Sequence, residues 1–164
     1  MQRVIVVEPD KCTGCRICEL VCSFFKEGEC NPTKSRIRVV SFREHGIDQP
    51  VLCLQCEDPP CMATCPVGAL KWDTKVGAVI LNTESCIGCK LCMMVCPIGA
   101  ISLASDRRIR KCDLCSGEPK CVKYCPTKAI DFVDVTRAAS SRQRSRQEVI
   151  VRSLLRAREE SRKF

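Results

Sequence analysis

Cysteine is the feature of this sequence that most restricts what the chain can fold into. Seventeen of the 164 residues are cysteine, and all but Cys30 fall into four groups of four. In chain order the groups are Cys12, Cys15, Cys18, Cys22; Cys53, Cys56, Cys61, Cys65; Cys86, Cys89, Cys92, Cys96; and Cys112, Cys115, Cys121, Cys125. A cysteine content this high indicates either a disulfide framework or a metal-binding protein.

Several observations favour metal over disulfides. The N-terminal apolar run at 4–7 is too short for a signal peptide, and no segment approaches the roughly 20 apolar residues of a membrane span. We therefore expect a cytoplasmic chain with no membrane span, in a compartment that keeps thiols reduced. The odd cysteine count also disfavours complete disulfide pairing. The sequence leaves one alternative open, which is export of the folded chain together with a partner that carries the signal.

The spacing within the groups points to iron–sulfur clusters. Groups one and three read C-x2-C-x2-C-x3-C, the run that binds [4Fe–4S] clusters in bacterial ferredoxins. Three closely spaced cysteines bind three iron corners of one cubane, and the last cysteine binds another cubane. Pro66, Pro97 and Pro126 follow the last cysteine in three groups, whereas Ser23 takes this place in group one. We interpret the longer middle gaps of groups two and four as surface loops.

Zinc is the main alternative to iron. It usually binds two separated C-x2-4-C pairs, which three cysteines at x2 intervals do not resemble. We therefore predict four [4Fe–4S] clusters bound by all sixteen grouped cysteines, with a zinc-binding nucleic-acid module as a remote alternative. The chain is short and has seven aromatic residues in total (one Trp, one Tyr and five Phe), which predicts a thin apolar core and folding coupled to metal binding.

The chain also repeats itself. The segment 12–22 matches 86–96 at an offset of 74 residues, and a second repeat, CP followed by three residues and an aliphatic one, occurs at 65–70, 96–101 and 125–130. The predicted unit is a strand, a cluster loop, a short helix that carries the last cysteine, a turn and another strand. We expect strands at 4–7, 37–42, 70–72 and 78–81, the last two forming a hairpin around Gly77.

Charge divides the chain into a head and a tail. Residues 136–164 carry nine Lys/Arg against three Glu, so +6 of the formal +8 lies there. An oxidised cubane with four thiolates carries about −2, so four clusters would make the head acidic. We interpret roughly 141–162 as an exposed helix and expect it to contact protein carboxylates, such as those of a neighbouring copy in a homo-oligomer or filament. The alternatives are a solvated helix and a helix bound to nucleic acid or an anionic membrane.

Residues for other chemistry are lacking. The single histidine, His45, lies in a polar stretch and is expected to be a loop residue, and no dinucleotide or nucleotide motif occurs. We therefore predict electron transfer and no catalytic site. Cys30 is expected to be a small buried apolar residue, with a reactive thiol or a spare ligand as alternatives. Charges beside the cysteines are expected to tune cluster potentials, upward for Lys11, Arg16 and Lys90 and downward for Asp10, Glu19 and Glu84.

The four groups, with CTGCRICELVCS (12–23) first and NPTKSRI (31–37) after it, resemble the four-cluster iron–sulfur subunits of multisubunit oxidoreductases. These include subunits of dimethyl sulfoxide reductase-type enzymes, formate hydrogenlyase and the ferredoxin-like partner of carbon monoxide dehydrogenase. Segment 31–37 most resembles the electron-transfer subunits of tungsten-containing aldehyde oxidoreductase complexes. The resemblance covers residues 3 to about 133 and leaves out the basic tail.

The resemblance implies an α+β fold of two ferredoxin-like 2[4Fe–4S] modules in a pseudo-twofold arrangement, plus a C-terminal helix. The expected domains are one module from 1–50 and 105–135, with groups one and four, an inserted module at 51–104, with groups two and three, and the basic helix at 136–164.

The resemblance further implies nested ligand sets, which we name A to D. Set A is Cys12, Cys15, Cys18 and Cys125; set B is Cys112, Cys115, Cys121 and Cys22; set C is Cys53, Cys56, Cys61 and Cys96; and set D is Cys86, Cys89, Cys92 and Cys65. Spacing alone leaves the sequential pairing open, in which group one pairs with two and group three with four.

We therefore expect an electron-transfer subunit of an oxidoreductase. By resemblance, one partner is a catalytic tungsten or molybdenum pterin subunit that oxidises an aldehyde or similar donor, and the other is a flavoprotein, a ferredoxin or another copy. The alternatives are a stand-alone polyferredoxin and an electron subunit of a hydrogenase, formate dehydrogenase or carbon monoxide dehydrogenase.

Overall fold

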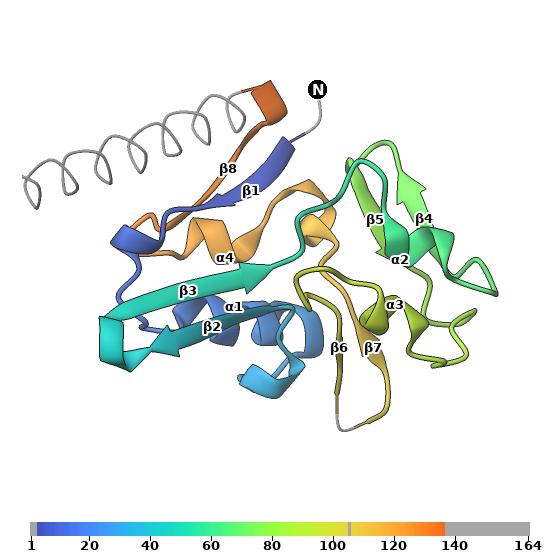
Figure 1. The fold of residues 1–164 in the computed structure, drawn as a ribbon, viewed down its shortest axis with the longest axis horizontal. Coiled ribbons are helices and arrows are strands. Elements are labelled where there is room, and N and C mark those ends of the chain that lie inside the picture. The colour runs from blue at the N-terminus through green and yellow to red at the C-terminus, as the bar shows by residue number, and fades with distance from the viewer. Residues whose placement is uncertain (1–2, 105, 137–164) are drawn as a thin grey trace, which may run out of the picture. The chain divides into compact units, whose positions relative to one another are not determined.

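The computed structural model of the chain describes residues 3–104 and 106–136 (Figure 1). The chain divides into two compact units, one of Ile5–Phe132 and one of Met1–Val4 with Val133–Phe164. All sixteen grouped cysteines belong to the unit Ile5–Phe132, so the site can be described within it. The helix predicted at 141–162 lies outside the described residues.

The described strands form four two-stranded sheets. Strand β1 (Arg3–Val7) pairs with β8 (Ile130–Asp134). The other three sheets are antiparallel and pair β2 (Ile37–Phe42) with β3 (Ile47–Leu52), β4 (Leu70–Asp73) with β5 (Ala78–Leu81), and β6 (Ser102–Leu103) with β7 (Ile109–Arg110). The strands predicted at 4–7, 37–42, 70–72 and 78–81 are confirmed, including the hairpin around Gly77.

The helices are short, with one exception. They are α1 (Ile17–Glu27), α2 (Pro60–Ala63), α3 (Leu91–Met94) and α4 (Lys120–Lys123), together with the 3-10 turns η1 (Pro9–Lys11), η2 (Pro32–Lys34), η3 (Arg43–His45) and η4 (Leu114–Gly117). Among the described helices, none is long and apolar enough to cross a membrane.

The prediction that a short helix carries the last cysteine of each group is wrong for three groups. Helices α2, α3 and α4 carry the third cysteine and end before Cys65, Cys96 and Cys125. Proline follows each of these cysteines, and a residue that precedes proline is sterically disfavoured in the helical conformation. The chain therefore turns at the last cysteine of these groups.

Helix α1 continues through its last cysteine because Ser23, not proline, comes next. Ser23 is fully buried. Its Oγ donates a hydrogen bond to the Leu20 carbonyl and accepts one from the Asn31 backbone N–H, both at 3.0 Å. Proline inside the helix would lose a backbone hydrogen bond and clash with the preceding turn. The departure from the proline pattern thus allows α1 to extend to Glu27.

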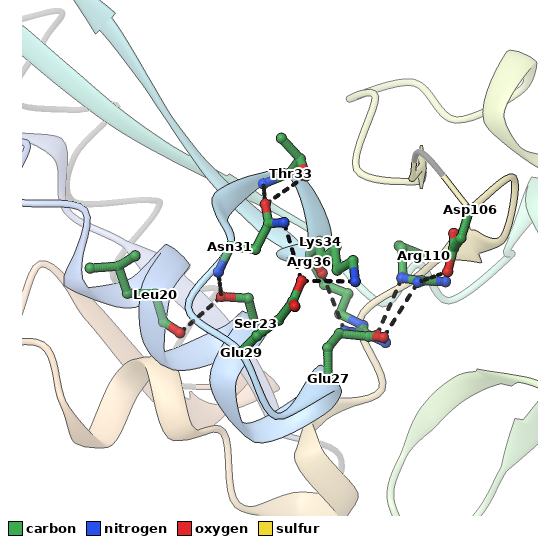
Figure 2. A network of polar contacts seen from close by, with 10 residues as sticks. All are labelled: Leu20, Ser23, Glu27, Glu29, Asn31, Thr33, Lys34, Arg36, Asp106 and Arg110. Atoms are coloured by element: carbon green, nitrogen blue, oxygen red, sulfur yellow. Dashed lines mark hydrogen bonds and ion pairs between the residues drawn. The ribbon is translucent and has the colours of Figure 1, made fainter.

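A network of polar contacts joins the end of α1 to the β6–β7 region (Figure 2). Glu27 Oε1 lies 2.6 Å from Arg36 Nη2 and 3.2 Å from Arg110 Nε. Arg110, which is 3% exposed, also lies 2.6 Å from Asp106 Oδ2. Glu27 therefore connects the segment after α1 with strand β7.

Two apolar cores contain most of the buried side chains. The first core has Ile5, Cys18, Cys22, Ile37, Val39, Leu52, Ala78, Leu114, Cys121 and Ile130. The second core has Cys61, Leu70, Val79, Cys92, Ile101 and Ile109. Cysteines of groups one and four thus pack in the first core, and cysteines of groups two and three pack in the second.

Strand β5 belongs to both cores. Ala78 and Ile80 pack in the first core, while Val79 and Leu81 pack in the second. Successive side chains of a strand point to opposite faces, so a single short strand can serve both. Its partner strand β4 contributes Leu70 and Trp72 to the second core.

Candidate metal centres

A first hollow, with about 350 Å³ of empty space including its open side, lies beside the first core. Its lining includes the four cysteines of set B, which are Cys22, Cys112, Cys115 and Cys121. Cys22 comes from α1, whereas the other three come from the segment after β7. The structure thus brings the last cysteine of group one together with the first three of group four.

A second hollow of about 370 Å³ lies beside the second core. Its lining includes the four cysteines of set C, which are Cys53, Cys56, Cys61 and Cys96. Cys96 follows α3, Cys61 lies in α2, and Cys53 and Cys56 precede α2. Here the last cysteine of group three joins the first three of group two.

Set A lies at the first core. Cys18 is buried there, and Cys12 and Cys125 pack against the same core. Burial raises the pKa of Cys18 to about 12, with a further contribution from the charge of Glu19 and smaller ones from Cys15 and Cys12. Cys15 is exposed.

Set D is placed in a similar way at the second core. Cys92 is buried in that core, and Cys65 and Cys86 pack against it. Burial raises the pKa of Cys92, and the neighbouring charges of Cys86, Cys61 and Cys89 add to the rise. Cys89 is exposed. Sets A and D thus each have one cysteine at the protein surface.

The third cysteine of every group is buried, as Cys18, Cys61, Cys92 and Cys121 show. Burial is the largest cause of the raised pKa at each of these thiols. The thiolate is the form that binds a metal, so metal binding must displace protons at these positions.

The last cysteine of groups one, two and three accepts a hydrogen bond from a backbone N–H group. Ala69 N–H donates to Cys65 Sγ, Ala100 N–H to Cys96 Sγ, and Arg36 N–H to Cys22 Sγ, each at 3.3 Å. At Cys65 burial acts to raise the pKa, but the backbone N–H groups of residues 67–70 outweigh it and lower the pKa. Hydrogen bonds to sulfur also help to set the potential of an iron–sulfur cluster.

The donor sets fit a [4Fe–4S] cluster. In residues 3–104 and 106–136, no three or more Cys, His, Asp or Glu side chains lie close enough to hold a single metal ion. A cubane needs a wider arrangement, with four thiolates placed around the corners of a cube. Four cysteines around one small and mainly apolar hollow, as found twice here, satisfy that need.

Other predictions for single residues have mixed outcomes. Cys30 is exposed, so its prediction as a buried apolar residue is wrong. It follows the turn after α1, where no core lies over it. His45 lies exposed in η3, outside both hollows, as expected of a loop residue.

Among the six charges predicted to tune potentials, Glu19 is the buried one, at 4% exposure. Its Oε1 accepts a hydrogen bond from Val39 N–H at 2.6 Å, while its Oε2 has no hydrogen-bond partner among the described residues. The other five, Asp10, Lys11, Arg16, Glu84 and Lys90, are exposed.

Two polar residues at the second hollow were missed in the sequence. Lys111 and Gln55 both contribute to its lining and are 6% and 3% exposed. Their places next to Cys112 and Cys56 are the only indication that the sequence offers. Burial raises the pKa of both Cys61 and Cys112, the latter to about 12, and Lys111 is the charged side chain that opposes this rise at each.

Comparison with known families agrees with this chemistry. Residues 46–135 match the family described as the 4Fe-4S dicluster domain, which covers more than half of the chain. Residues 9–24 match the family described as the 4Fe-4S binding domain.

Three similar proteins have related descriptions. The polyferredoxin-like subunit of an aliphatic sulfonate oxidoreductase from Pyrococcus furiosus is 46% identical over 122 residues, covering 74% of this chain and 70% of that protein. The putative electron transport protein YsaA of Escherichia coli is 41% identical over 157 residues, covering 88% and 98%. Formate hydrogenlyase subunit 2 of Escherichia coli is 33% identical over 186 aligned positions, covering 90% and 89%.

Proposed function

The chain belongs to the 4Fe-4S dicluster domain family of electron-transfer subunits, and on this premise we propose that its cysteines bind four [4Fe–4S] clusters in the nested sets A to D. The observation that carries the proposal is the composition of the two hollows. Each has three cysteines of one group and the last cysteine of its nested partner. Sequential pairing would instead place Cys22 with group two.

The contacts favour a single path through the protein in the order A, B, C, D. Sets A and B share the first core, and sets C and D share the second. Sets B and C are electrostatic neighbours, because the charge of Cys53 adds to the effect of burial in raising the pKa of Cys112. Each bound cluster would supply one site that gains and loses a single electron.

The exposed cysteines support the two ends of this path. Cys15 of set A and Cys89 of set D are exposed, whereas the cysteines of sets B and C are buried or half-buried. We propose that one end faces a catalytic subunit and that the other faces a flavoprotein, a ferredoxin or another copy. The catalytic partner in this proposal is a tungsten or molybdenum pterin enzyme, and the location is cytoplasmic.

The arrangement of the whole chain is part of the same proposal. We propose two modules in a pseudo-twofold arrangement, with one built from 1–50 and 105–135 and the other from 51–104. The basic segment 136–164 is proposed to contact a protein partner. A stand-alone polyferredoxin is the second candidate, favoured by the YsaA relative, whose description names an electron transport protein and no parent enzyme.

Replacement of Cys22 by Ser tests the nested sets. We expect the cluster of set B to be lost or converted to a three-iron form, while the signals of sets C and D persist in electron paramagnetic resonance (EPR) spectra and iron analysis. Cys30→Ser is the matched control, because Cys30 is exposed and outside the sets, and it should keep all the iron. Loss of the set C cluster in Cys22→Ser, with set B intact, would contradict the proposal.

A further inference from the structure

Lys111 is a buried cation held entirely by neutral groups. Its Nζ donates hydrogen bonds to the Val79 carbonyl at 2.6 Å, the Cys112 carbonyl at 3.2 Å and the Gln55 Oε1 at 3.3 Å. Cys112 packs against the first core, Val79 lies in the second core on the strand that serves both, and Gln55 lines the second hollow.

No carboxylate of the described residues forms an ion pair with Lys111. This separates it from the cations at the first hollow, where Lys26 pairs with Asp113 and Arg36 pairs with Glu27, both at 2.6 Å. An ammonium group taken out of water without an opposite charge is strongly disfavoured. The position of Lys111 therefore calls for a nearby negative charge that the side chains do not supply.

The two flanking ligand sets offer such a charge. Lys111 lines the hollow of set C and directly precedes Cys112 of set B. A [4Fe–4S] cluster with four thiolates carries a net negative charge, which becomes more negative by one on reduction. This inference therefore rests on the proposed ligand sets B and C.

We propose that Lys111 is a positioning residue for electron transfer between the two middle clusters, and that its charge raises the reduction potentials of both. An electron that leaves one of these clusters is gained by the other, and nothing else is exchanged. Because Lys111 stabilises the reduced form on either side, each middle cluster accepts an electron more readily than it would beside a neutral residue, which favours passage between the cores.

Gln55 fixes the ammonium group in this place. Its Oε1 accepts hydrogen bonds from Lys111 Nζ and Val79 N–H at 3.3 and 3.2 Å, and its Nε2 donates to the Cys112 carbonyl at 3.0 Å. Its backbone adopts a left-handed conformation with φ of 50°, which is unfavourable for a residue with a Cβ. The side chain thus uses both its donor and its acceptor to connect the two sets.

The test is a redox titration of the iron-loaded chain, followed by EPR. In Lys111→Met we expect the reduction potentials of two of the four clusters to fall by at least about 59 mV. For one electron, this shift is a tenfold change in the ratio of oxidised to reduced cluster. Lys111→Arg keeps the charge and should restore most of the shift. Lys71→Met is the matched control, because Lys71 is exposed on β4 and its loss should change no potential comparably.

A second variant decides the matter if Lys111→Met loses iron. Lys111→Gln removes the charge but keeps a side chain that can donate a hydrogen bond to the surrounding carbonyls, so the same two potentials should fall while the iron content is unchanged. Unchanged potentials in the iron-loaded variants would overturn the inference, as would an equal shift of all four clusters. Failure of the ligand sets themselves would appear separately, in Cys22→Ser.

Discussion

The two cores surround the proposed ligand sets with different secondary-structure elements. The first core includes the eleven-residue helix α1 and buries Ile5, Ile37, Val39, Leu52, Leu114 and Ile130. The second core has helices of four residues and buries Leu70, Val79, Ile101 and Ile109. The ion pairs of Lys26 with Asp113 and of Glu27 with Arg36 also lie at the first core, while a second ion pair of Glu27 reaches Arg110 of β7.

The difference suggests that the cores depend on metal to different extents. Apart from cysteine, the second core buries four apolar side chains against seven in the first, and its strands and helices are too short to be stable alone. Cross-linking by a bound cluster therefore contributes more of the folding free energy there. The first core has more apolar contact that is independent of iron.

Removal of iron is expected to have the largest effect. Anaerobic chelation should unfold much of the chain, with hydrogen-exchange protection lost first in β4–β5 and β6–β7 and last in β2–β3. Hydrogen exchange followed by mass spectrometry at increasing chelator concentration measures the order. Simultaneous loss of protection in all three hairpins would remove the proposed difference between the cores.

Weakening the first core directly should have the next largest effect. Ile37 is 2% exposed, so Ile37→Ala is expected to lower the free energy of unfolding by about 2–5 kcal/mol, through lost burial and a residual cavity. Denaturant titration of the iron-loaded protein without oxygen measures this loss.

The matched control for Ile37 lies on the same strand. Val40 is 42% exposed, and Val40→Ala should change stability by no more than about 0.5 kcal/mol. Equal effects of the two substitutions would show that iron, not packing, determines the stability of the first core as well.

The smallest effect is expected from Ser23→Ala, which removes the hydrogen bonds of Ser23 Oγ to the Leu20 carbonyl and the Asn31 N–H, while the Asn31 N–H keeps its bond to the Glu29 carbonyl at 3.1 Å. Loss of a hydrogen bond of this kind lowers the free energy of unfolding by about 0.5–1.5 kcal/mol. The EPR signals of sets C and D should be unaltered, since Ser23 belongs to the first core's helix. Ser85→Ala, at an exposed position, serves as control. A change in the set C or D signals would mean that the two cores are not separable.

The sequence predicts local features better than tertiary contacts. Apolar alternation correctly predicted the strand at 78–81, and the regular spacing that predicts the sixteen cysteines as cluster ligands is likewise a local pattern. The short helices differ from the prediction because Pro66, Pro97 and Pro126 disfavour the helical conformation at the cysteine that precedes each of them.

Long-range contacts account for the remaining errors. Lys111 is separated by 56 residues from Gln55 and by 32 from Val79, and no local pattern connects them. Cys30 looked like a packed thiol by composition, but its burial depends on which elements cover it, and the fold leaves it exposed. The partition of side chains between two cores within β5 is likewise a property of the tertiary structure.

The double role of β5 limits how the chain can change in length. One residue inserted between β4 and β5 could shift the pairing register of the two strands by one. Ala78 and Ile80 would then face the second core, and Val79 and Leu81 would face the first. The gaps between the second and third cysteines of groups two and four contain exposed residues, at Glu57 and Asp58 and at Glu118, where we expect a change in length to be tolerated. Related chains should therefore differ in length at these positions while the turn at 74–77 keeps its size.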